Sequence, residues 1–215
     1  MHTMIHLLYS SFNERFSTEK YNHYLNLLPV DMAQRIGKYH RWQDAHAGLI
    51  GKLLLIEGLK KYGGGHQWLG DIKYSEYSRP YLDLVEFNIS HSGNYVLCAI
   101  SNDQLRIGVD VEQIRPIEFS DFDRQFTDAE WQVIKSDPDP LRGFYKMWTK
   151  KEAIVKADGK GLSIPLNDII IDNNTARVGD EYWYLKPIDI DQHHIIHLAC
   201  DQNVEQELTL ERLSL

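Results

Sequence analysis

Hydrophobic residues recur along this chain at two different spacings. Because segments with one spacing follow segments with the other, we predict a mixture of helices and strands. The longest helical pattern runs from Asp44 to Tyr62, where leucine and isoleucine return every three or four residues and form a broad apolar face. Short apolar runs bounded by turn residues indicate strands. Strands are predicted at 4–9, 87–91, 95–101, 106–114, 168–172, 181–189 and 193–200, and two further helices at 18–28 and 30–38.

Start signals define two more helices in the second half of the chain. Thr127 and Glu130 have the spacing of a capping box, in which each side chain accepts a backbone hydrogen bond of the other residue. Asp139 stands before Pro140, which is the usual order of a cap and a first helical residue. The second signal therefore starts the helix that carries residues 148–157.

Glycines both weaken and end the long helix of the first half. Gly48, Gly51 and Gly58 each cost about 1 kcal/mol relative to alanine, so packing against a partner must hold this helix. The run 63–65 consists of three glycines and ends the helix. It is not a phosphate-binding loop, because no strand precedes it and no helix starts from it.

The two halves of the chain also show a weak internal repetition. Each half has one long helix followed by strands, and in each half an apolar strand contains a cysteine, at 95–99 and at 195–200. This repetition predicts two related α+β lobes that are joined near residue 105.

The composition is that of an ordinary folded protein, with 43% hydrophobic and 25% charged residues. No apolar run approaches the roughly 20 residues needed to cross a bilayer, and residues 1–6 lack the pattern of a signal peptide, so we expect a cytoplasmic protein without a membrane partner. The net charge of −8 argues against nucleic-acid binding through a broad basic surface, but a local basic cluster can still hold phosphates. Cys98 and Cys200 lie in apolar runs and are expected to be buried, reduced thiols.

Four residues on two predicted elements form the candidate chemical centre. Asp110 and Glu112 alternate along a strand and project from one face, while Glu152 and Lys156 lie one turn apart on a helix. Three carboxylates and a lysine at one point would suit a hard divalent cation and a phosphate chain. Taken alone, the acidic pair is more often a solvated face, and Glu152 with Lys156 is an ordinary helix pair. Gly108 leaves room for the close approach of another backbone.

A second polar cluster occupies residues 90–93, with the sequence Ser-His-Ser-Gly at the junction of a strand and a turn. Hydroxyls, an imidazole and turn N–H groups suit phosphate oxygens, although His91 could equally be a core histidine. Arg79 lies at a rigid turn before a proline, and Arg35 and Lys38 lie shortly before the long helix. Each of these cations, taken alone, is most often a surface charge.

Two other kinds of site receive little support. His193, His194 and His197 suggest a metal, but residues 194 and 197 face opposite sides of a strand, which disfavours zinc. A serine hydrolase is disfavoured because the chain has no Gly-x-Ser-x-Gly segment.

Taken together, these segments resemble the motifs of the 4′-phosphopantetheinyl transferase family, in its two-lobed surfactin-synthetase-activator branch. Arg79-Pro80 resembles the basic-residue-proline motif, and 87–93 resembles the Asn-x-Ser-His-Ser segment. Residues 107–112 match the Gly-x-Asp-x-Glu strand, and 148–156 match the Trp-Thr-x-Lys-Glu helix that ends in lysine, with 159–162 following as in relatives. Four such motifs in order are far more specific than any one of them.

The resemblance implies an α+β fold of two pseudo-symmetric lobes, 1–105 and 106–215, each a small, mainly antiparallel sheet packed on a long helix. It implies a monomeric enzyme that transfers 4′-phosphopantetheine from coenzyme A to a serine of an acyl- or peptidyl-carrier protein, leaving 3′,5′-ADP. Such carriers serve fatty-acid, polyketide and nonribosomal-peptide synthesis. The first lobe would bind the nucleotide, and the second would provide the metal site, the catalytic helix and the carrier-docking surface.

The resemblance also implies roles for individual residues. Asp110, Glu112 and Glu152 would bind Mg²⁺, or Mn²⁺ in its place. Glu152 would act as the general base, and Lys156 would stabilise the leaving phosphate oxygen. Coenzyme A would be bound by Asp110 and Lys156 together with Arg35, Lys38, Arg79, Ser90 and His91.

Two other functions stay open at this point: a hydrolase that cleaves the coenzyme A pyrophosphate, and a module that binds coenzyme A without turnover. The expected carrier-docking region is 119–130, including Phe122 and Phe126, together with Trp131. The same aromatic residues are equally expected of an amphipathic helix that packs into the core.

Overall fold

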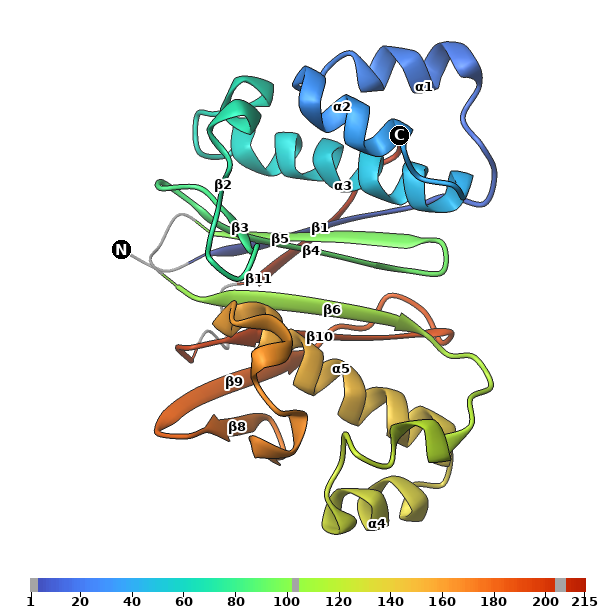
Figure 1. The fold of residues 1–215 in the computed structure, drawn as a ribbon, viewed down its shortest axis with the longest axis vertical. Helices are drawn as coiled ribbons and strands as arrows, with labels where there is room; N and C mark the ends of the chain where they lie inside the picture. The colour runs from blue at the N-terminus through green and yellow to red at the C-terminus, as the bar shows by residue number, and fades with distance from the viewer. Residues whose placement is uncertain (1–3, 102–104, 204–207) are drawn as a thin grey trace. The chain divides into compact units, whose positions relative to one another are not determined.

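The computed structural model describes residues 4–101, 105–203 and 208–215 of the chain, which form two compact units (Figure 1). One unit comprises 1–104 with 207–215, and the other comprises 105–206. Both units combine helices with a sheet, which confirms the predicted α+β class. No helix among the described residues is long and apolar enough to span a membrane.

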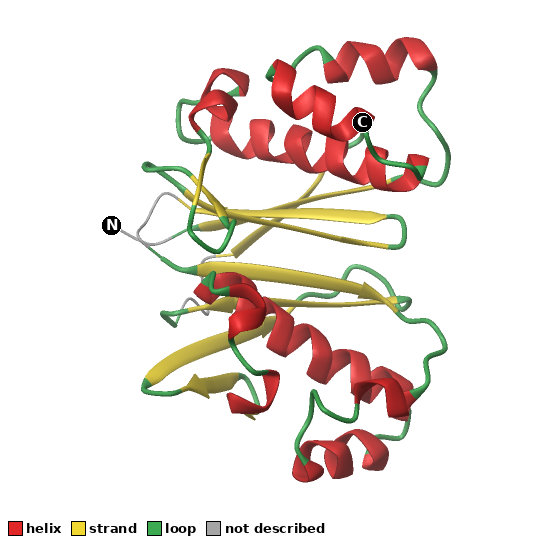
Figure 2. Cartoon of the chain, in the orientation of Figure 1, coloured by secondary structure: helices red, strands yellow, loops and turns green. Residues whose placement is uncertain are grey.

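The first unit is built on a four-stranded sheet in the order β11-β1-β5-β4. Its neighbouring strands are antiparallel except for β1 and β11, which run parallel. Helices cover one face of this sheet (Figure 2). The strands are β1 (Ile5–Ser11), β4 (Glu86–Ser92), β5 (Tyr95–Ser101) and β11 (Leu208–Arg212), with a small separate pair, β2 (Lys73–Tyr74) and β3 (Pro80–Tyr81). The helices are α1 (Thr18–Leu25), α2 (Val30–Gly37), α3 (Trp42–Lys60) and the 3₁₀ segment η1 (His66–Asp71).

The glycines of α3 allow this helix to lie close to the sheet. A Cβ atom added at Gly58 would lie 2.9 Å from Ile100 Cγ2, and one added at Gly51 would lie 3.0 Å from Ile89 Cγ2. Any larger side chain at these positions would push the helix away from β5 and β4. Two of the glycines that weaken α3 in isolation, Gly51 and Gly58, are therefore residues that let it pack on the sheet.

A buried histidine joins α3 to the segment that precedes α1. The Phe16 backbone N–H donates to His46 Nε2 at 3.0 Å, so that nitrogen must be the acceptor, and Nδ1 carries the proton that it donates to the Trp42 carbonyl at 2.9 Å. Burial is the main cause of a pKa below the ordinary value for His46; the cation of Arg15 lowers it further, and the bond to the Trp42 carbonyl opposes both. The neutral ring is thus the form that fits this site.

This arrangement predicts a pH-dependent stability. Because the folded state holds the His46 pKa below the unfolded value of about 6.5, the unfolded state binds more protons, and stability falls as the pH drops below about 6.5. Urea denaturation at neutral and mildly acidic pH measures this loss. His46→Gln should show a smaller pH dependence than the wild type, whereas His23→Gln, at an exposed histidine of the same unit, should keep it. An identical pH slope in His46→Gln would contradict the assignment.

The second unit is built on a five-stranded antiparallel sheet in the order β6-β10-β9-β8-β7. A helix of 19 residues, α5, packs on it, as the 19-residue α3 packs on the other sheet. The strands are β6 (Ile107–Gln113), β7 (Ile169–Asp172), β8 (Thr175–Val178), β9 (Glu181–Pro187) and β10 (His194–Cys200). The helices are α4 (Asp128–Ser136) and α5 (Pro140–Asp158), with 3₁₀ segments η2 (Phe119–Phe122), η3 (Gly161–Ser163) and η4 (Leu166–Asp168).

Local signals in the sequence set the ends of these helices. Thr127 and Glu130 form both bonds of a capping box at the start of α4. The Asp139 side chain accepts from the Arg142 N–H at the start of α5, and Gly159 ends α5 in the left-handed conformation with φ of 83°. Both predicted helix starts are therefore confirmed.

The C-terminal strand differs from the division made on the sequence, which assigned all of 106–215 to one lobe. In the structure β11 pairs with β1, so residues 208–215 belong to the first unit. The physical reason is non-local, because this strand gains its hydrogen bonds from a partner about 200 residues earlier in the chain. Cys98 and Cys200 are buried and free, as predicted.

Candidate active site

The candidate site of the second unit starts from the face of β6 that is turned toward α5. Asp110 pairs with His197 and Gly108 with Ala199 in the register of β6 and β10. A Cβ atom added at Gly108 would lie well inside 3.0 Å of the Ala153 carbonyl oxygen in α5. Because side chains alternate along a strand, Asp110 and Glu112 project from the same face as Gly108. The close backbone approach predicted from Gly108 is confirmed, and the structure shows that α5 is the approaching element.

An ion pair joins the two elements that carry the predicted residues. The Lys156 ammonium lies 2.6 Å from Asp110 Oδ1, and Asp110 is only 3% exposed. Lys156 lies one turn beyond Glu152 on α5, so both project from one side of the helix. The contact fixes the C-terminal half of α5 against the middle of β6.

The charges of these four residues act on one another. Burial is the main cause that raises the pKa of the Glu152 carboxyl above its ordinary value, and the negative charge of Asp110 raises it further. The Lys156 cation lowers the same pKa, and Glu112 adds a smaller raising effect. Glu152 is therefore a carboxyl group whose proton affinity is increased, which is the property that a general base or acid near neutral pH requires.

The donor set fits a hard divalent cation. Asp110, Glu112 and Glu152 offer carboxylate oxygens, and the repulsion that raises the Glu152 pKa is what a bound cation would relieve. Within the described parts of the chain, however, no three acidic, histidine or cysteine side chains already converge as a metal-binding group. The Lys156 ammonium occupies the cation position beside Asp110. A metal would therefore require local rearrangement of these side chains.

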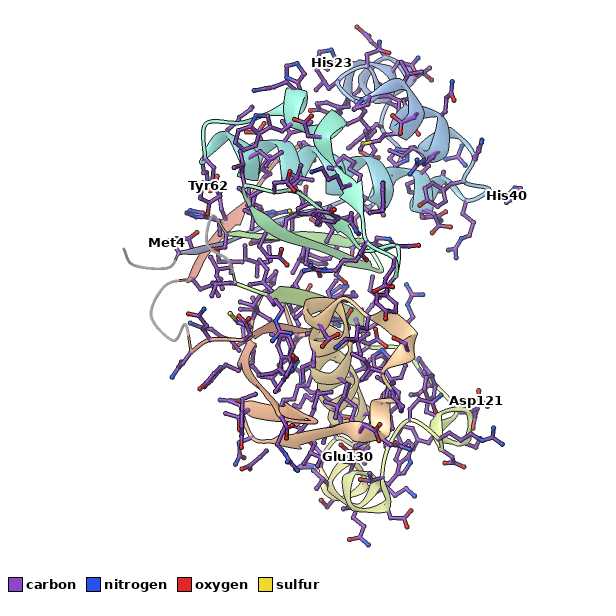
Figure 3. All side chains as sticks on the ribbon, turned by 60° about the vertical axis from the view of Figure 1, so that its left-hand side comes forward. Met4, His23, His40, Tyr62, Asp121 and Glu130 are labelled. Atoms are coloured by element: carbon purple, nitrogen blue, oxygen red, sulfur yellow. The ribbon has the colours of Figure 1, made fainter. Side chains whose placement is uncertain are left out.

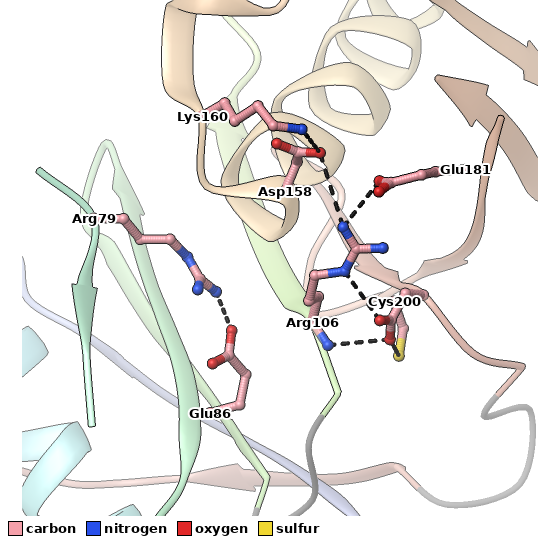
Figure 4. Close-up of polar contacts among 8 residues, drawn as sticks. Arg79, Glu86, Arg106, Asp158, Lys160, Glu181 and Cys200 are labelled. Carbon is pink, nitrogen blue, oxygen red and sulfur yellow. Dashed lines mark hydrogen bonds and ion pairs between the residues drawn. The ribbon is translucent and has the colours of Figure 1, made fainter. Parts of the chain in front are cut away.

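The other predicted residues lie in the first unit. Ser90 is buried in β4, and the next residue, His91, is exposed on the opposite face of that strand. Arg79, which precedes β3, forms an ion pair with Glu86, the first residue of β4 (Figure 4). Both side chains of this pair are largely buried. The predicted phosphate-binding cation is thus paired with a carboxylate in this structure.

Arg35 and Lys38 lie at the C-terminal end of α2. Arg35 donates to the Tyr74 hydroxyl at 3.1 Å and lies 3.6 Å from Asp31, one turn earlier on the helix. Lys38 is exposed just beyond the last residue of α2. The structure thus gathers four of the nine predicted residues, those of β6 and α5, and distributes the other five over elements of the first unit.

The sequence did not predict the role of Lys151, whose side chain is 0% exposed. Its ammonium lies 2.8 Å from Glu130 Oε2, 2.8 Å from the Leu166 carbonyl oxygen and 5.2 Å from the centre of the Phe126 ring. Burial lowers the Lys151 pKa and Glu130 opposes this. Lys151 therefore ties α4, the preceding loop and η4 to α5, one residue before Glu152 (Glu130 is labelled in Figure 3).

A signal for Lys151 exists in the sequence. Lys151 has the helical spacing of Phe144, Trp148 and Val155, which form one apolar side of the predicted helix, so an apolar residue is expected at position 151. A lysine in such a stripe indicates a buried partner. The predicted docking aromatics Phe126 and Trp131 are buried in this same cluster, which supports their alternative role as core residues.

Arg106 organises the far end of the unit (Figure 4). Its guanidinium donates to Asp201 at 3.1 Å and to Glu181 at 2.9 Å, and it lies 4.5 Å from the centre of the Trp183 ring. Asp158, at the end of α5, lies 3.9 Å away. The cluster connects the ends of β6, β9 and β10 to the last residue of the helix that carries Lys156.

Comparison with known proteins gives matches over most of the chain. The sequence model of one protein family, the 4′-phosphopantetheinyl transferase superfamily, matches residues 106–208. The sequence model of a second family, described as 4′-phosphopantetheinyl transferase, N-terminal, matches residues 15–103. The gap between these matches coincides with the boundary between the two units.

Individual relatives share about three residues in ten with this chain. The 4′-phosphopantetheinyl transferase gsp of Aneurinibacillus migulanus is 31% identical over 81% of this chain and 74% of its own length. The 4′-phosphopantetheinyl transferase Sfp of Bacillus subtilis (strain 168) is 30% identical over 76% of this chain and 75% of its own. The L-aminoadipate-semialdehyde dehydrogenase-phosphopantetheinyl transferase of Homo sapiens is 27% identical over 77% of this chain and 64% of its own length.

Proposed function

The chain belongs to the 4′-phosphopantetheinyl transferase superfamily, and from this premise we propose that it transfers 4′-phosphopantetheine from coenzyme A to a carrier protein in a Mg²⁺-dependent reaction. The acceptor is a serine hydroxyl of an acyl- or peptidyl-carrier protein, and the second product is 3′,5′-ADP. The observation that carries the proposal is the group formed by Asp110, Glu112, Glu152 and Lys156, in which Lys156 contacts Asp110 and Glu152 has a raised pKa.

The reaction forms one bond to phosphorus, breaks one bond to phosphorus and moves one proton. The serine oxygen bonds to the phosphorus next to pantetheine, while the bridging bond of the pyrophosphate breaks and its electrons go to the oxygen of the leaving 3′,5′-ADP. Glu152 takes the proton of the serine hydroxyl, for which its raised proton affinity is suited. Lys156 contributes a positive charge beside the leaving oxygen.

The three carboxylates would hold the metal ion. Bound between Asp110, Glu112 and Glu152, Mg²⁺ would neutralise the charge of the pyrophosphate oxygens as a Lewis acid. Asp110 would exchange its present contact with Lys156 for the ion, which frees the ammonium group for a phosphate oxygen.

Residues of the first unit would bind the remaining phosphates. Ser90 and His91 carry groups that suit phosphate oxygens; they lie on opposite faces of β4, and His91 is the exposed one. Arg79 would exchange Glu86 for a phosphate, since a guanidinium binds either anion in a bidentate manner. Arg35 and Lys38 add positive charge at the end of α2. A cytoplasmic, monomeric state remains a prediction from the sequence, which sedimentation and cell fractionation would test.

The role of Asp110 predicts a shifted metal requirement. Asp110→Ala removes one of three ligands, so the Mg²⁺ concentration that gives half-maximal transfer should rise by at least about tenfold. Mg²⁺ titration of the transfer rate measures the shift. Asp180→Ala, at an exposed aspartate of the same unit, is the matched control and should titrate like the wild type. An unchanged Mg²⁺ titration in Asp110→Ala would remove this residue from the metal site.

The proposed function is tested by intact-mass spectrometry of an apo carrier protein incubated with this chain, coenzyme A and Mg²⁺. The expected result is a gain of one phosphopantetheine mass that is lost when EDTA is added. Release of 3′,5′-ADP and free phosphopantetheine with no change in the carrier would instead indicate a hydrolase. Binding of coenzyme A without any product, across several carrier types, would indicate a sequestering module.

A further inference from the structure

A hollow of about 270 Å³ lies along the flank of α5 that is turned toward β9 and the turn between β7 and β8. Three cations of α5 line it at intervals of four residues, Arg142, Lys146 and Lys150, so they project from one side of the helix. The described residues that complete the lining are Asn174, Pro187, Ile188, Asp189, His194, Ile195, Ile196 and His197.

This hollow is separate from the candidate active site. The Lys156 ammonium reaches Asp110 on β6, whereas the Lys150 ammonium donates to the Asn173 carbonyl at 2.7 Å, in the turn between β7 and β8. β6 and β7 are the two opposite edges of the five-stranded sheet. Lys150 and Glu152 are two residues apart and therefore point about 200° apart around the helix axis. The body of α5 thus lies between the two sites.

The three positive charges at the hollow are only partly neutralised by carboxylates. Arg142 donates to the Gln192 carbonyl at 2.9 Å and Lys150 to the Asn173 carbonyl, and both acceptors are uncharged. Within the described residues, neither cation forms an ion pair with a carboxylate. Lys146 pairs with Asp137 at 3.1 Å, and the charge of Asp137 also acts on Arg142. The acid in the lining, Asp189, is exposed. On a chain with a net charge of −8, such a local excess of positive charge indicates an anionic ligand.

The size of the hollow restricts that ligand. Sites for drug-sized molecules occupy about 300–1,000 Å³, so a volume near the lower limit suits a compact ion rather than a nucleotide. A tetrahedral oxyanion offers acceptors to those of these long side chains that reach it, and charge-assisted bonds of this kind are about twice as strong as neutral ones. We propose that the hollow lined by Arg142, Lys146 and Lys150 binds a phosphate-sized oxyanion, as a second anion site of this enzyme.

Calorimetric titration of inorganic phosphate into the full chain, at constant ionic strength in chloride, tests this site. Phosphate should bind the wild type and raise its melting temperature, because a ligand of the folded state stabilises it. Lys150→Gln and Arg142→Gln should each weaken phosphate binding about tenfold. Lys135→Gln, at an exposed lysine of α4, should bind phosphate like the wild type. Melting curves in chloride alone verify that each variant is folded.

Two outcomes would overturn the proposal. One is the absence of phosphate binding by the wild type. The other is binding that survives in Lys150→Gln and Arg142→Gln but is lost in Lys156→Gln, since the ion would then occupy the candidate active site. The inference does not depend on the transfer reaction. A chain that binds phosphate through Lys150 but modifies no carrier would disprove only the proposed function.

Discussion

Glu152→Gln is expected to lower kcat for phosphopantetheine transfer by about 10²–10⁴-fold, the range that a general base typically contributes. The amide cannot accept the proton of the serine hydroxyl, while its size and shape are those of the carboxyl group. Coenzyme A binding should largely survive, because its phosphates are assigned to other side chains. Steady-state transfer kinetics and calorimetric titration of coenzyme A measure the two quantities separately.

The same substitution should leave the fold intact or stabilise it. Asp110 and Glu112 repel the Glu152 carboxylate, and glutamine removes this repulsion. A lowered melting temperature would therefore indicate that Glu152 has a structural role. Glu118→Gln, at an exposed glutamate of the same unit, is the matched control and should transfer at the wild-type rate. Normal turnover by Glu152→Gln would disprove its assignment as the base.

Gly108→Ala is expected to cause the largest loss of stability, about 3 kcal/mol or more, at the upper end of the cost of overpacking. The added methyl group would meet the Ala153 carbonyl oxygen and the Ala157 nitrogen, both well inside 3.0 Å. These are backbone atoms of α5, so no side-chain rotation can relieve the clash. The helix must move away from β6, which separates Lys156 from Asp110 and should also reduce transfer.

Urea denaturation and the transfer assay test this prediction together. Gly37→Ala is the control, because a Cβ atom at Gly37 has no neighbour within 4 Å. It should leave both stability and transfer near the wild-type values. If Gly108→Ala were as stable as Gly37→Ala, this result would contradict the close packing of α5 on β6.

The parts of the fold that were predictable from the sequence are those fixed by local chemistry. The apolar face of α3 and the cap residues Thr127 and Asp139 act within a few residues, and each has the expected effect. The parallel partner of β1 was not predictable. Strand periodicity shows that a segment can pair but does not identify the strand with which it pairs.

The candidate site shows the same division. Asp110, Glu112, Glu152 and Lys156 were predicted because each pair follows the period of its own element, and the contact of Lys156 with Asp110 unites the pairs. The pairing of Arg79 with Glu86 was not predicted, since both residues belong to segments without a strong pattern. Lys151 was overlooked because its partner Glu130 already had an explanation as a capping residue.

The position of β11 has a consequence for biosynthesis. The second unit is formed by one continuous stretch, 105–206, inserted between two parts of the first. During translation, 105–206 leaves the ribosome before 208–212, so β1 keeps a bare edge until 208–212 have emerged. The nascent chain is therefore expected to complete its inserted unit first. Ser10 and Lys61 can gain their bonds to Leu213 and Glu211 only after that unit has emerged.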